Sequence, residues 1–476
     1  MHTSLASGQA EGSRAPGDPV TPAFGVLGRL IAPLFPAPPV TTKPKPKPAP
    51  GRRWLIAAGY LVCLCAGAAL SLARYVGTPP WRTIYAEDLP VYLVEALAHP
   101  WRSLFSPYAG YLQLVPRIIG QFVSLLPLHD AAAGFAIIGA LVTSACALFI
   151  FRVSASHVQH PLMRGLLALS VVLLPVALLQ IANSGVNTPW YLLIALFWAM
   201  LWRPRSAGGM ALAAFVGFAA ASSNVTAVVF AVLVAVRLIA LPRVREHAVT
   251  AGWLAGCLVQ VPYFLRSSSS SSSRLSTLAT PGQSTAFYGH AVVLPAFGWH
   301  LSWVLQHWWN RNYALLLVGG ILAIVVAVIL VTGSARVRAF TVTALVFGFL
   351  FTAFAATVTY WVTIDSPKPG TEPGARYTCL PILLITAVLI VAADSRLMSG
   401  GLRRPAGVIA AIGLIAVLCV GWIPDFRYLA GRNSAPLWAP TASRWLETCR
   451  HSGAIRYYDT YDNYTTLIIP CSRLRG

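Results

Sequence analysis

Two adjacent carboxylates, Glu87 and Asp88, are the residues of this chain best suited to acid–base chemistry. The chain has only 14 acidic residues among 476, and this pair lies in an aromatic-rich stretch from Trp81 to Gly120. The stretch directly follows the first long apolar segment, so the pair is expected at a membrane face. A carboxylate near low-dielectric surroundings can have its pKa raised toward the range that suits a general base.

Only one of the two carboxylates is expected to point into a site, because adjacent residues on a helix or strand face different ways. Asp88 precedes Leu89-Pro90, and the proline stiffens the backbone there. A base must lie within hydrogen-bond reach of the proton that it takes. We therefore favour Asp88 as the base, with Glu87 as its companion. The plain alternative is a pair of solvated loop acids.

Arg376 and Tyr377 stand where a polar segment leads into an apolar run. The planar guanidinium pairs bidentately with phosphate oxygens, and its expected depth matches that of a lipid phosphate headgroup. The pair can therefore bind a donor phosphate. It can equally be a snorkelling arginine beside an interfacial tyrosine, and both interpretations stay open.

Arg117 is flanked by Gln113 and Gln121, each four residues away in an otherwise apolar segment. On a helix these three side chains share one face, which gives a polar stripe on an apolar rod. The stripe either faces lipid headgroups or lies beside a phosphate or a sugar.

Further candidates to contact a substrate are Tyr85, Gln113, His307 and Arg311. The last two belong to the run HLSWVLQHWWNRNY, residues 300–313, although Trp and Tyr also gather at membrane interfaces without any binding role. A metal site would need more acids or histidines at fixed spacing. Neither GxGxxG, Walker A, HExxH nor GxSxG occurs in a suitable context. We therefore expect no metal and no cofactor.

Composition places the chain in a membrane. Its residues are 57% hydrophobic and only 10% charged, and the mean hydropathy is +0.66. Runs of about 20 apolar residues, enough to cross a bilayer core, recur along it. A charge of +21 on a soluble protein would suggest nucleic acid. Here the basic residues lie in the N-terminal tail and in short loops between apolar runs, which membrane topology explains better.

The predicted fold is all-α and polytopic, with about eleven transmembrane helices. Residues 1–53 are predicted to be a disordered Pro-rich cytoplasmic tail, 54–423 the transmembrane domain, and 424–476 a small extracytoplasmic cap. The first outer loop, residues 77–130 (below, the first loop), is expected to carry interfacial helices at Pro90–Ala98 and Tyr108–Leu128. A polar turn at Ser222-Ser223-Asn224 should separate two short spans. The predicted spans are 54–76, 131–151, 165–182, 189–202, 207–222, 224–240, 248–265, 313–332, 340–362, 377–393 and 407–423.

The charges of the loops alternate as this topology requires. With the N-terminus inside, eleven spans put the C-terminus outside, in the cell membrane. Loops assigned to the inside contain Arg152, Arg164, Arg203, Arg205, Arg237, Arg243, Arg245, Arg336, Arg338, Arg396, Arg403 and Arg404, with Glu246 and Asp394 as their acids. Loops assigned to the outside contain Glu87, Asp88, Glu95, Asp130, Asp365 and Glu372. The positive-inside rule is satisfied at each turn.

Two of the eight cysteines differ from the rest. Cys449 and Cys471 lie in the polar C-terminal segment, whereas the other six lie in or beside apolar runs, where cysteine behaves as a small hydrophobe. On the oxidising side of a membrane such a pair is expected to form a disulfide. Two free thiols are the alternative.

The chain resembles the GT-C superfamily, the integral-membrane glycosyltransferases that use polyprenyl-phosphate sugars. The resemblance covers residues 54–476 in architecture. It is carried by YAEDLPVYL, SLFSPYAGYLQLVPR, NTPWYLLIALFWAMLWRPRS and GARYTCLP, which look similar to uncharacterised bacterial members. In that superfamily a catalytic acid stands in the first outer loop just after the first span, as Asp88 with Glu87 does here. Many members carry Asp-Glu or Asp-Asp there, whereas this chain has Glu-Asp.

The resemblance implies transfer of a sugar from a polyprenyl-phosphate donor to an acceptor on the outer face, with inversion. Asp88 would take the acceptor proton, and Arg376 with Tyr377 and Arg117 would bind the donor phosphate. Membrane lipid, the lipid-linked sugar and an unknown glycan, lipid or protein acceptor would be the partners.

Two other functions remain as alternatives. A lipid or sugar transporter or flippase usually carries ionisable groups in mid-span, and none of the predicted spans contains Asp or Glu. A non-catalytic scaffold for envelope assembly would share every feature described so far, and activity alone separates it from an enzyme.

The predicted topology can be tested with fusions to alkaline phosphatase, whose own disulfides form only on the oxidising side. A fusion after Arg475 should be active, and a fusion in the loop at Arg403-Arg404 should be inactive. The reverse pattern would overturn the number of spans and move Asp88 off the outer face.

Overall fold

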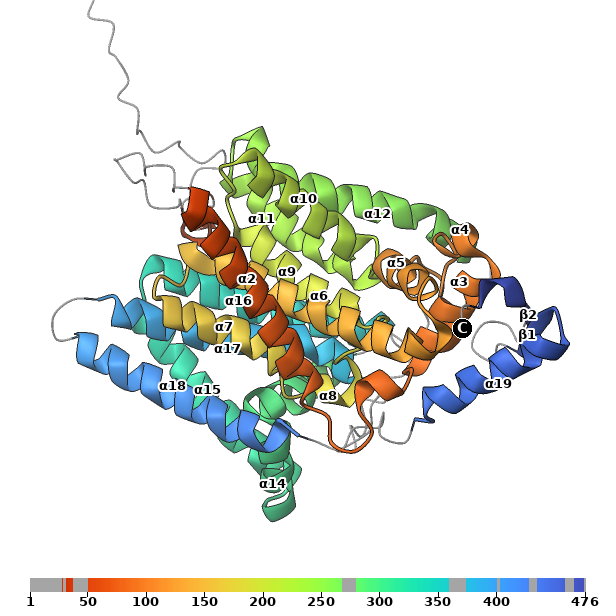
Figure 1. The fold of residues 1–476 in the computed structure, drawn as a ribbon. Coiled ribbons are helices and arrows are strands. Elements are labelled where there is room, and N and C mark those ends of the chain that lie inside the picture. The colour runs from red at the N-terminus through yellow and green to blue at the C-terminus, as the bar shows by residue number, and fades with distance from the viewer. Residues whose placement is uncertain are drawn as a thin grey trace, which may run out of the picture.

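The computed structural model describes residues 28, 31–36, 50–267, 280–358, 374–399, 403–427, 435–458 and 466–474. Figure 1 shows an almost wholly helical bundle with a small helix-and-strand unit at one end. Eight helical segments among these residues are long and apolar enough to cross a membrane, so the chain has the character of a multi-pass membrane protein. Their helices are α2 (Pro50–Leu72), α6 (Ala131–Val153), α7 (Pro161–Val172) with α8 (Ala177–Gln180), α12 (Ala248–Ser267), α15 (Arg311–Thr332), α16 (Ala335–Val358), α17 (Ala375–Leu397) and α18 (Arg403–Asp425).

Three further predicted spans correspond to shorter apolar helices. These are α9 (Thr188–Leu201), α10 (Ala207–Ala221), and η7 (Val225–Phe230) continued by α11 (Ala231–Ala240). The polar turn between the last two lies where the sequence predicts it, because α10 ends at Ala221 and the Asn224 side chain accepts from the Thr226 amide to begin η7. The prediction of eleven transmembrane helices requires these three short helices to cross the membrane as well as the eight long segments.

Burial separates central helices from peripheral ones. Every residue of α9 is buried, and 83% of the apolar window of α17 is buried, against 11% for α2 and for α15. The apolar side chains on the outer faces of α2 and α15 need an apolar solvent, which a bilayer supplies. The helices α9 and α17 therefore form the packed centre, and α2 and α15 face lipid.

The predicted span 165–182 is interrupted. Helix α7 ends at Val172 and α8 begins only at Ala177, and Pro175 between them lacks an N–H for a helical hydrogen bond. The freed carbonyls are satisfied by Arg74, which is buried and donates to Val172 (2.8 Å) and Leu174 (3.0 Å). An arginine thus stabilises a break in an otherwise apolar segment.

The first loop folds into short helical pieces. They are η2 (Pro80–Arg82), η3 (Ala86–Asp88), η4 (Leu89–Val94), α3 (Glu95–Ala98), α4 (Pro100–Ser103), α5 (Leu114–Val123) and η5 (Leu128–Asp130). The helix expected over Pro90–Ala98 corresponds to η4 and α3. The expectation of a helix over Tyr108–Leu128 is wrong at its start, because Tyr108 and Tyr111 pair across a tight turn and α5 begins only at Leu114.

A segment between α12 and α15 forms its own set of short helices. These are α13 (Pro281–Tyr288), η10 (Gly289–Val293), η11 (Leu294–Phe297) and α14 (Trp299–Trp308). The Asp425 carboxylate at the end of α18 accepts from the backbone amides of Trp299 and His300. This carboxylate occupies the N-terminal end of α14, where unpaired amides favour negative charge.

The C-terminal cap consists of α19 (Trp438–His451) and an antiparallel pair, β1 (Ala454–Tyr458) with β2 (Thr466–Pro470), in which Arg456 pairs with Ile468. The structure joins Cys449 to Cys471 by a disulfide, the pairing that the sequence analysis expects. The cap is fixed to the first loop by the Trp438 indole, which donates to the Leu128 carbonyl at 2.6 Å.

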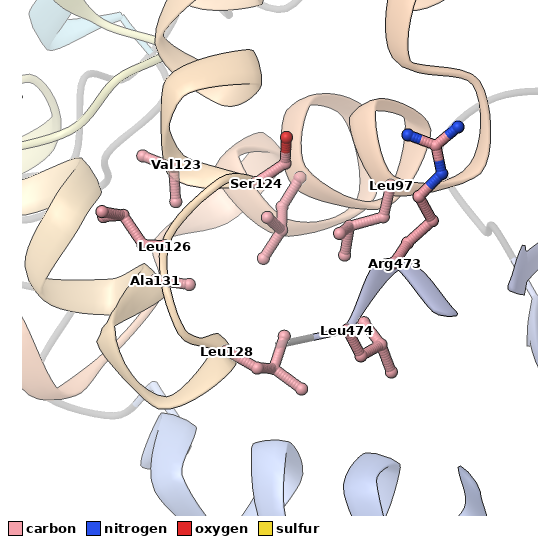
Figure 2. A pocket seen from close by; sticks show the side chains of 9 residues that line it. Leu97, Val123, Ser124, Leu126, Leu128, Ala131, Arg473 and Leu474 are labelled. Carbon is pink, nitrogen blue, oxygen red and sulfur yellow. The ribbon is translucent and has the colours of Figure 1, made fainter. Parts of the chain in front are cut away.

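A small hollow lies between the cap and the first loop (Figure 2). Leu93, Leu97, Val123, Ser124, Leu126, Leu128 and Ala131 line it from the first loop and the start of α6, and Arg473 and Leu474 line it from the cap. Because the lining is apolar apart from Ser124 and Arg473, we interpret it as a packing seam rather than a place for chemistry.

Residues 31–36 correct the prediction for the N-terminal tail. The tail composition predicts that it buries nothing, yet Leu34 and Phe35 are 1% and 3% exposed, and η1 (Ala32–Leu34) forms a helical turn. Apolar side chains of a short segment can be buried when the helix bundle itself supplies the core. The rest of the predicted tail, apart from residue 28 and residues 50–53 at the start of α2, lies outside the described residues.

The disulfide leads to a prediction about the cap. Thiol alkylation of the unreduced protein in denaturant should label neither Cys449 nor Cys471. Cys449→Ser should speed hydrogen exchange in β1 and β2, since opening this link, which joins residues 22 apart, removes on the order of 3 kcal/mol of loop-closure stabilisation. The control Cys419→Ser, at a free and half-buried thiol in α18, should leave that exchange unchanged. Equal exchange in the two variants would contradict the prediction.

Candidate active site

The Asp88 carboxylate is buried and occupied by a distant loop. It is 0% exposed and accepts from Ser184 Oγ and the Gly185 amide at 3.0 Å each and from the Val186 amide at 2.7 Å. A carboxylate that accepts two backbone amides and a hydroxyl in a buried place has its charge stabilised by them. The Asp88 side chain therefore ties the first loop to residues 184–186.

The sequence of the segment 183–187 suits this contact. Asn183 adopts φ of 54°, a left-handed conformation that asparagine tolerates better than most residues, and its side chain exchanges hydrogen bonds with Ser71 at 2.8 and 2.9 Å. A Cβ at Gly185 would lie 2.7 Å from Phe135 Cδ1 and 3.0 Å from Asp88 Oδ1. Only glycine lets the backbone approach the carboxylate so closely.

Glu87 points elsewhere. Its side chain is half-buried, and its Oε1 accepts from the Tyr108 hydroxyl at 3.1 Å. It also attracts Arg376 through space, and no direct ion pair joins these two described side chains. Of the two adjacent carboxylates, Glu87 is therefore the one whose charge acts on Arg376.

Arg376 lies in the first turn of α17, at the end of the bundle that carries the first loop. Its backbone amide donates to Gln180 Oε1 at 3.2 Å, and its guanidinium carbon lies 5.2 Å from the centre of the Tyr377 ring. Tyr377 in turn packs edge-on against Trp190, with ring centres 4.9 Å apart. The Arg376 Nε is buried without a hydrogen-bond partner, a costly arrangement for a polar atom.

Two tyrosines of the first loop complete the cluster. Tyr108 and Tyr111 exchange backbone hydrogen bonds of 2.9 and 3.3 Å around Ala109 and Gly110, whose φ values of 53° and 84° match a type I′ turn. Burial raises the pKa of both phenols above the ordinary value, and Glu87 raises it further. Both hydroxyls therefore stay protonated at physiological pH and can act as hydrogen-bond donors.

Backbone strain gathers at the same place. Among the described residues, Ala86, Ala109 and Asn183 are the non-glycine residues with positive φ. The first precedes Glu87, the second lies between Tyr108 and Tyr111, and the third begins the loop that binds Asp88. Such conformations cost about 1–3 kcal/mol each and concentrate at functional sites. Their grouping here identifies this cluster as the candidate site independently of its charges.

Arg117 is buried within the first loop. It is 2% exposed and donates to the Glu95 carboxylate and to the Val91 carbonyl, both at 2.7 Å. Gln113 accepts from the Tyr92 hydroxyl at 2.5 Å and donates to the Tyr111 hydroxyl at 3.0 Å. The interpretation in which this polar stripe faces lipid headgroups is therefore wrong. The stripe faces the interior of the first loop, and Arg117 holds that loop together.

Of the remaining candidates to contact a substrate, Tyr85 lies beside Glu87, whereas His307 and Arg311 lie in another part of the chain. Tyr85 belongs to the turn before Glu87, and its carbonyl accepts from the Asp88 amide at 3.0 Å. His307 is exposed on α14 and stacks on Trp303 with ring centres 5.4 Å apart, and Arg311 begins α15. Figure 1 places α14 well away from α3 and α5. Among the described residues, no hydrogen bond, ion pair or ring contact joins His307 or Arg311 to Glu87, Tyr108, Tyr111 or Arg376.

Sequence analysis did not single out Tyr108, Tyr111, Gln180 or Ser184. The Ala-Gly dipeptide between two tyrosines was a signal for a tight turn. The polar residues of QIANSGVN, 180–187, also stand out in an apolar run. The partner that each would meet could not be inferred from these signals.

Comparisons of the chain with family models, with curated proteins and with solved structures find no match. The function must therefore be argued from the residues themselves.

The two adjacent acids should differ sharply in their effect on stability. Asp88→Asn puts an amide NH₂ where three donors require an acceptor, and should cost about 3 kcal/mol. Glu87→Gln keeps an oxygen for Tyr108 on a half-buried side chain, and should cost about 0.5 kcal/mol or less. Thermal unfolding of each variant in detergent measures this, and equal midpoints would contradict the structural role of Asp88.

Proposed function

We propose that this chain is a membrane glycosyltransferase that moves a sugar from a polyprenyl-phosphate donor to an acceptor hydroxyl, with inversion at the anomeric carbon. The observation that carries the proposal is the convergence of a half-buried acid, Glu87, with Arg376 and two protonated tyrosines. The cluster lies at one end of a bundle of helices that are long and apolar enough to cross a membrane. This reaction needs two groups, namely a carboxylate base that takes the proton of the acceptor hydroxyl and a cation that stabilises the leaving phosphate.

Glu87 takes the acceptor proton in this proposal. One of its oxygens accepts from Tyr108, which leaves the other for the acceptor hydroxyl. As the proton moves to Glu87, the acceptor oxygen forms a bond to the anomeric carbon, and the bond from that carbon to the phosphate oxygen breaks. The electron pair leaves with the lipid phosphate. The sequence-based choice of Asp88 is revised to a positioning role, in which its fixed carboxylate holds the backbone beside Glu87.

Arg376 binds the departing phosphate. Its guanidinium has the fork geometry that suits phosphate, and its Nε has no protein partner, so a ligand oxygen could satisfy it. The amides of the first turn of α17 add the positive end of a helix dipole. Tyr377 and Trp190 form an aromatic wall beside the guanidinium. Arg117 has no part in this proposal because both of its terminal nitrogens donate to Glu95, Val91 and Pro107 within the first loop.

A proton-coupled transporter fits the described acids less well. Asp394 and Asp425 stand near the ends of α17 and α18, and each accepts from two backbone amides of a neighbouring segment. Both therefore act as fixed acceptors for loops rather than as mid-span proton carriers. We also propose that the first loop and the cap face outward, as the distribution of arginines suggests.

The proposal is tested by transfer from radiolabelled polyprenyl-phosphate sugars to acceptors in a membrane extract, with purified full-length protein. Glu87→Gln should lower turnover about 100-fold or more, since it removes the base and keeps the shape. Arg376→Lys keeps the charge but loses the fork, and should raise the donor KM before it affects folding.

Two controls sharpen this experiment. Glu447→Gln changes an exposed acid of the cap, outside the cluster, and should leave turnover near that of the wild type. Asp88→Asn should lower turnover per folded molecule less than Glu87→Gln does, because it loosens the backbone beside the base without removing the base. If Glu87→Gln keeps full turnover in a preparation that transfers sugar, the proposed base is wrong. If wild-type protein transfers no tested sugar and binds no donor, a scaffold explains the chain better.

A further inference from the structure

Residues 31–36 contact the bundle at the end opposite to the candidate site. We call this segment, Ile31-Ala-Pro-Leu-Phe-Pro36, the strap, and the end where α2 begins the tail end. Arg376 and Asp394 lie at opposite ends of α17, and 18 residues of helix place them about 27 Å apart. The Asp394 carboxylate accepts from the Gln159 and His160 amides, which puts the loop that receives the strap at the tail end.

The strap is held by two buried side chains and by two carbonyls. Leu34 and Phe35 enter the main hydrophobic core, with 1% and 3% exposure. The Leu34 carbonyl lies 3.0 Å from His157 Nε2, and the Phe35 carbonyl accepts from Arg203 at 3.2 Å. Arg237 places its guanidinium carbon 5.7 Å from the centre of the Phe35 ring.

The groups that receive the strap are fixed by other parts of the chain. His157 lies against the rings of Trp198 and Phe340. Its Nδ1 lies 3.1 Å from the Ser156 hydroxyl, so a neutral ring donates from Nε2 to the Leu34 carbonyl. Burial lowers the pKa of His157 to about 4, which keeps the ring neutral.

The two arginines are fixed in the same way. Arg203 donates to the Glu246 carboxylate at 2.9 Å from its Nε. Arg237 donates to the carbonyls of Met200, Trp202 and Glu246. None of these contacts involves the strap, so the positions of the two arginines do not depend on it alone.

We propose that the tail end of the bundle carries a binding slot for a short peptide, formed by His157, Arg203, Arg237 and Phe340, and that the strap is its built-in ligand. The slot recognises adjacent leucine and phenylalanine side chains together with their two backbone carbonyls. The strap joins the loop after α6, the loop after α9, and helices α11 and α16, so its release frees these helix ends from one another.

The covalent link explains why the strap stays in place. Residues 37–49 connect it covalently to α2, so the strap binds as an intramolecular ligand and has the advantage over a free peptide. A peptide of the same sequence at micromolar concentration cannot compete with it. The same peptide binds when the strap of the chain itself is disabled.

The test uses full-length protein in detergent and a fluorescent peptide, GRLIAPLFPAP, with the sequence of residues 28–38. A chain carrying Leu34→Asp and Phe35→Asp should bind the peptide at least 10-fold more tightly than the wild type, measured by fluorescence anisotropy. Ala32→Ser, at an exposed position of the strap, is the matched control and should bind as weakly as the wild type. A peptide with both aspartates should bind neither protein.

Several outcomes would overturn the proposal. If the peptide binds the wild type and the double variant equally, it does not use the slot. If it binds neither, the slot does not recognise the segment in isolation. If the double variant aggregates on gel filtration while Ala32→Ser does not, the strap is an inseparable part of the core rather than a ligand. Arg203→Gln in the double variant should abolish the regained binding, and retained binding would exclude the slot.

Discussion

The buried Asp88 carboxylate is the contact on which the arrangement of the first loop depends. A charge removed from water must be compensated by donors, and residues 184–186 supply three of them. This contact joins two segments far apart in the chain and sets the backbone next to Asp88. Glu87 instead accepts from the Tyr108 hydroxyl. The Asp88 contact and the hydrogen bond from Tyr108 together position the proposed base.

Buried arginines donate hydrogen bonds to backbone carbonyls that are left without partners where helices are interrupted inside the apolar bundle. Arg74 satisfies the carbonyls freed between α7 and α8, and Arg237 does the same at the end of α9. Arg117 joins a carboxylate to a carbonyl within the first loop. Unpaired carbonyls in a low-dielectric interior are costly, and a guanidinium offers five donors to several of them at once. These three are among the most buried side chains of the described residues.

Helix α17 runs from the candidate site at one end of the bundle to the tail end at the other. Its first turn carries Arg376 and Tyr377 of the candidate site, and its last turns carry Asp394, which holds the loop that receives the strap. Most of its residues are buried between α7, α9, α16 and α18. The same packed helix therefore carries residues of the candidate site at one end and the acceptor for the loop that receives the strap at the other.

The sequence by itself determined the class of the protein, since long apolar runs and scarce charge permit little other than helices in a membrane. It also indicated the polar turn before Asn224 and the pairing of Cys449 with Cys471. It could not decide between Glu87 and Asp88, because the donors that occupy Asp88 lie 96 to 98 residues away. It could not identify the partners of Arg117 for the same reason, since Glu95 and Val91 become its partners only when the first loop folds back on itself. Local pattern specifies helices and their apolar faces, whereas the direction of a polar side chain depends on which distant donors and acceptors the packed bundle brings within 3 Å.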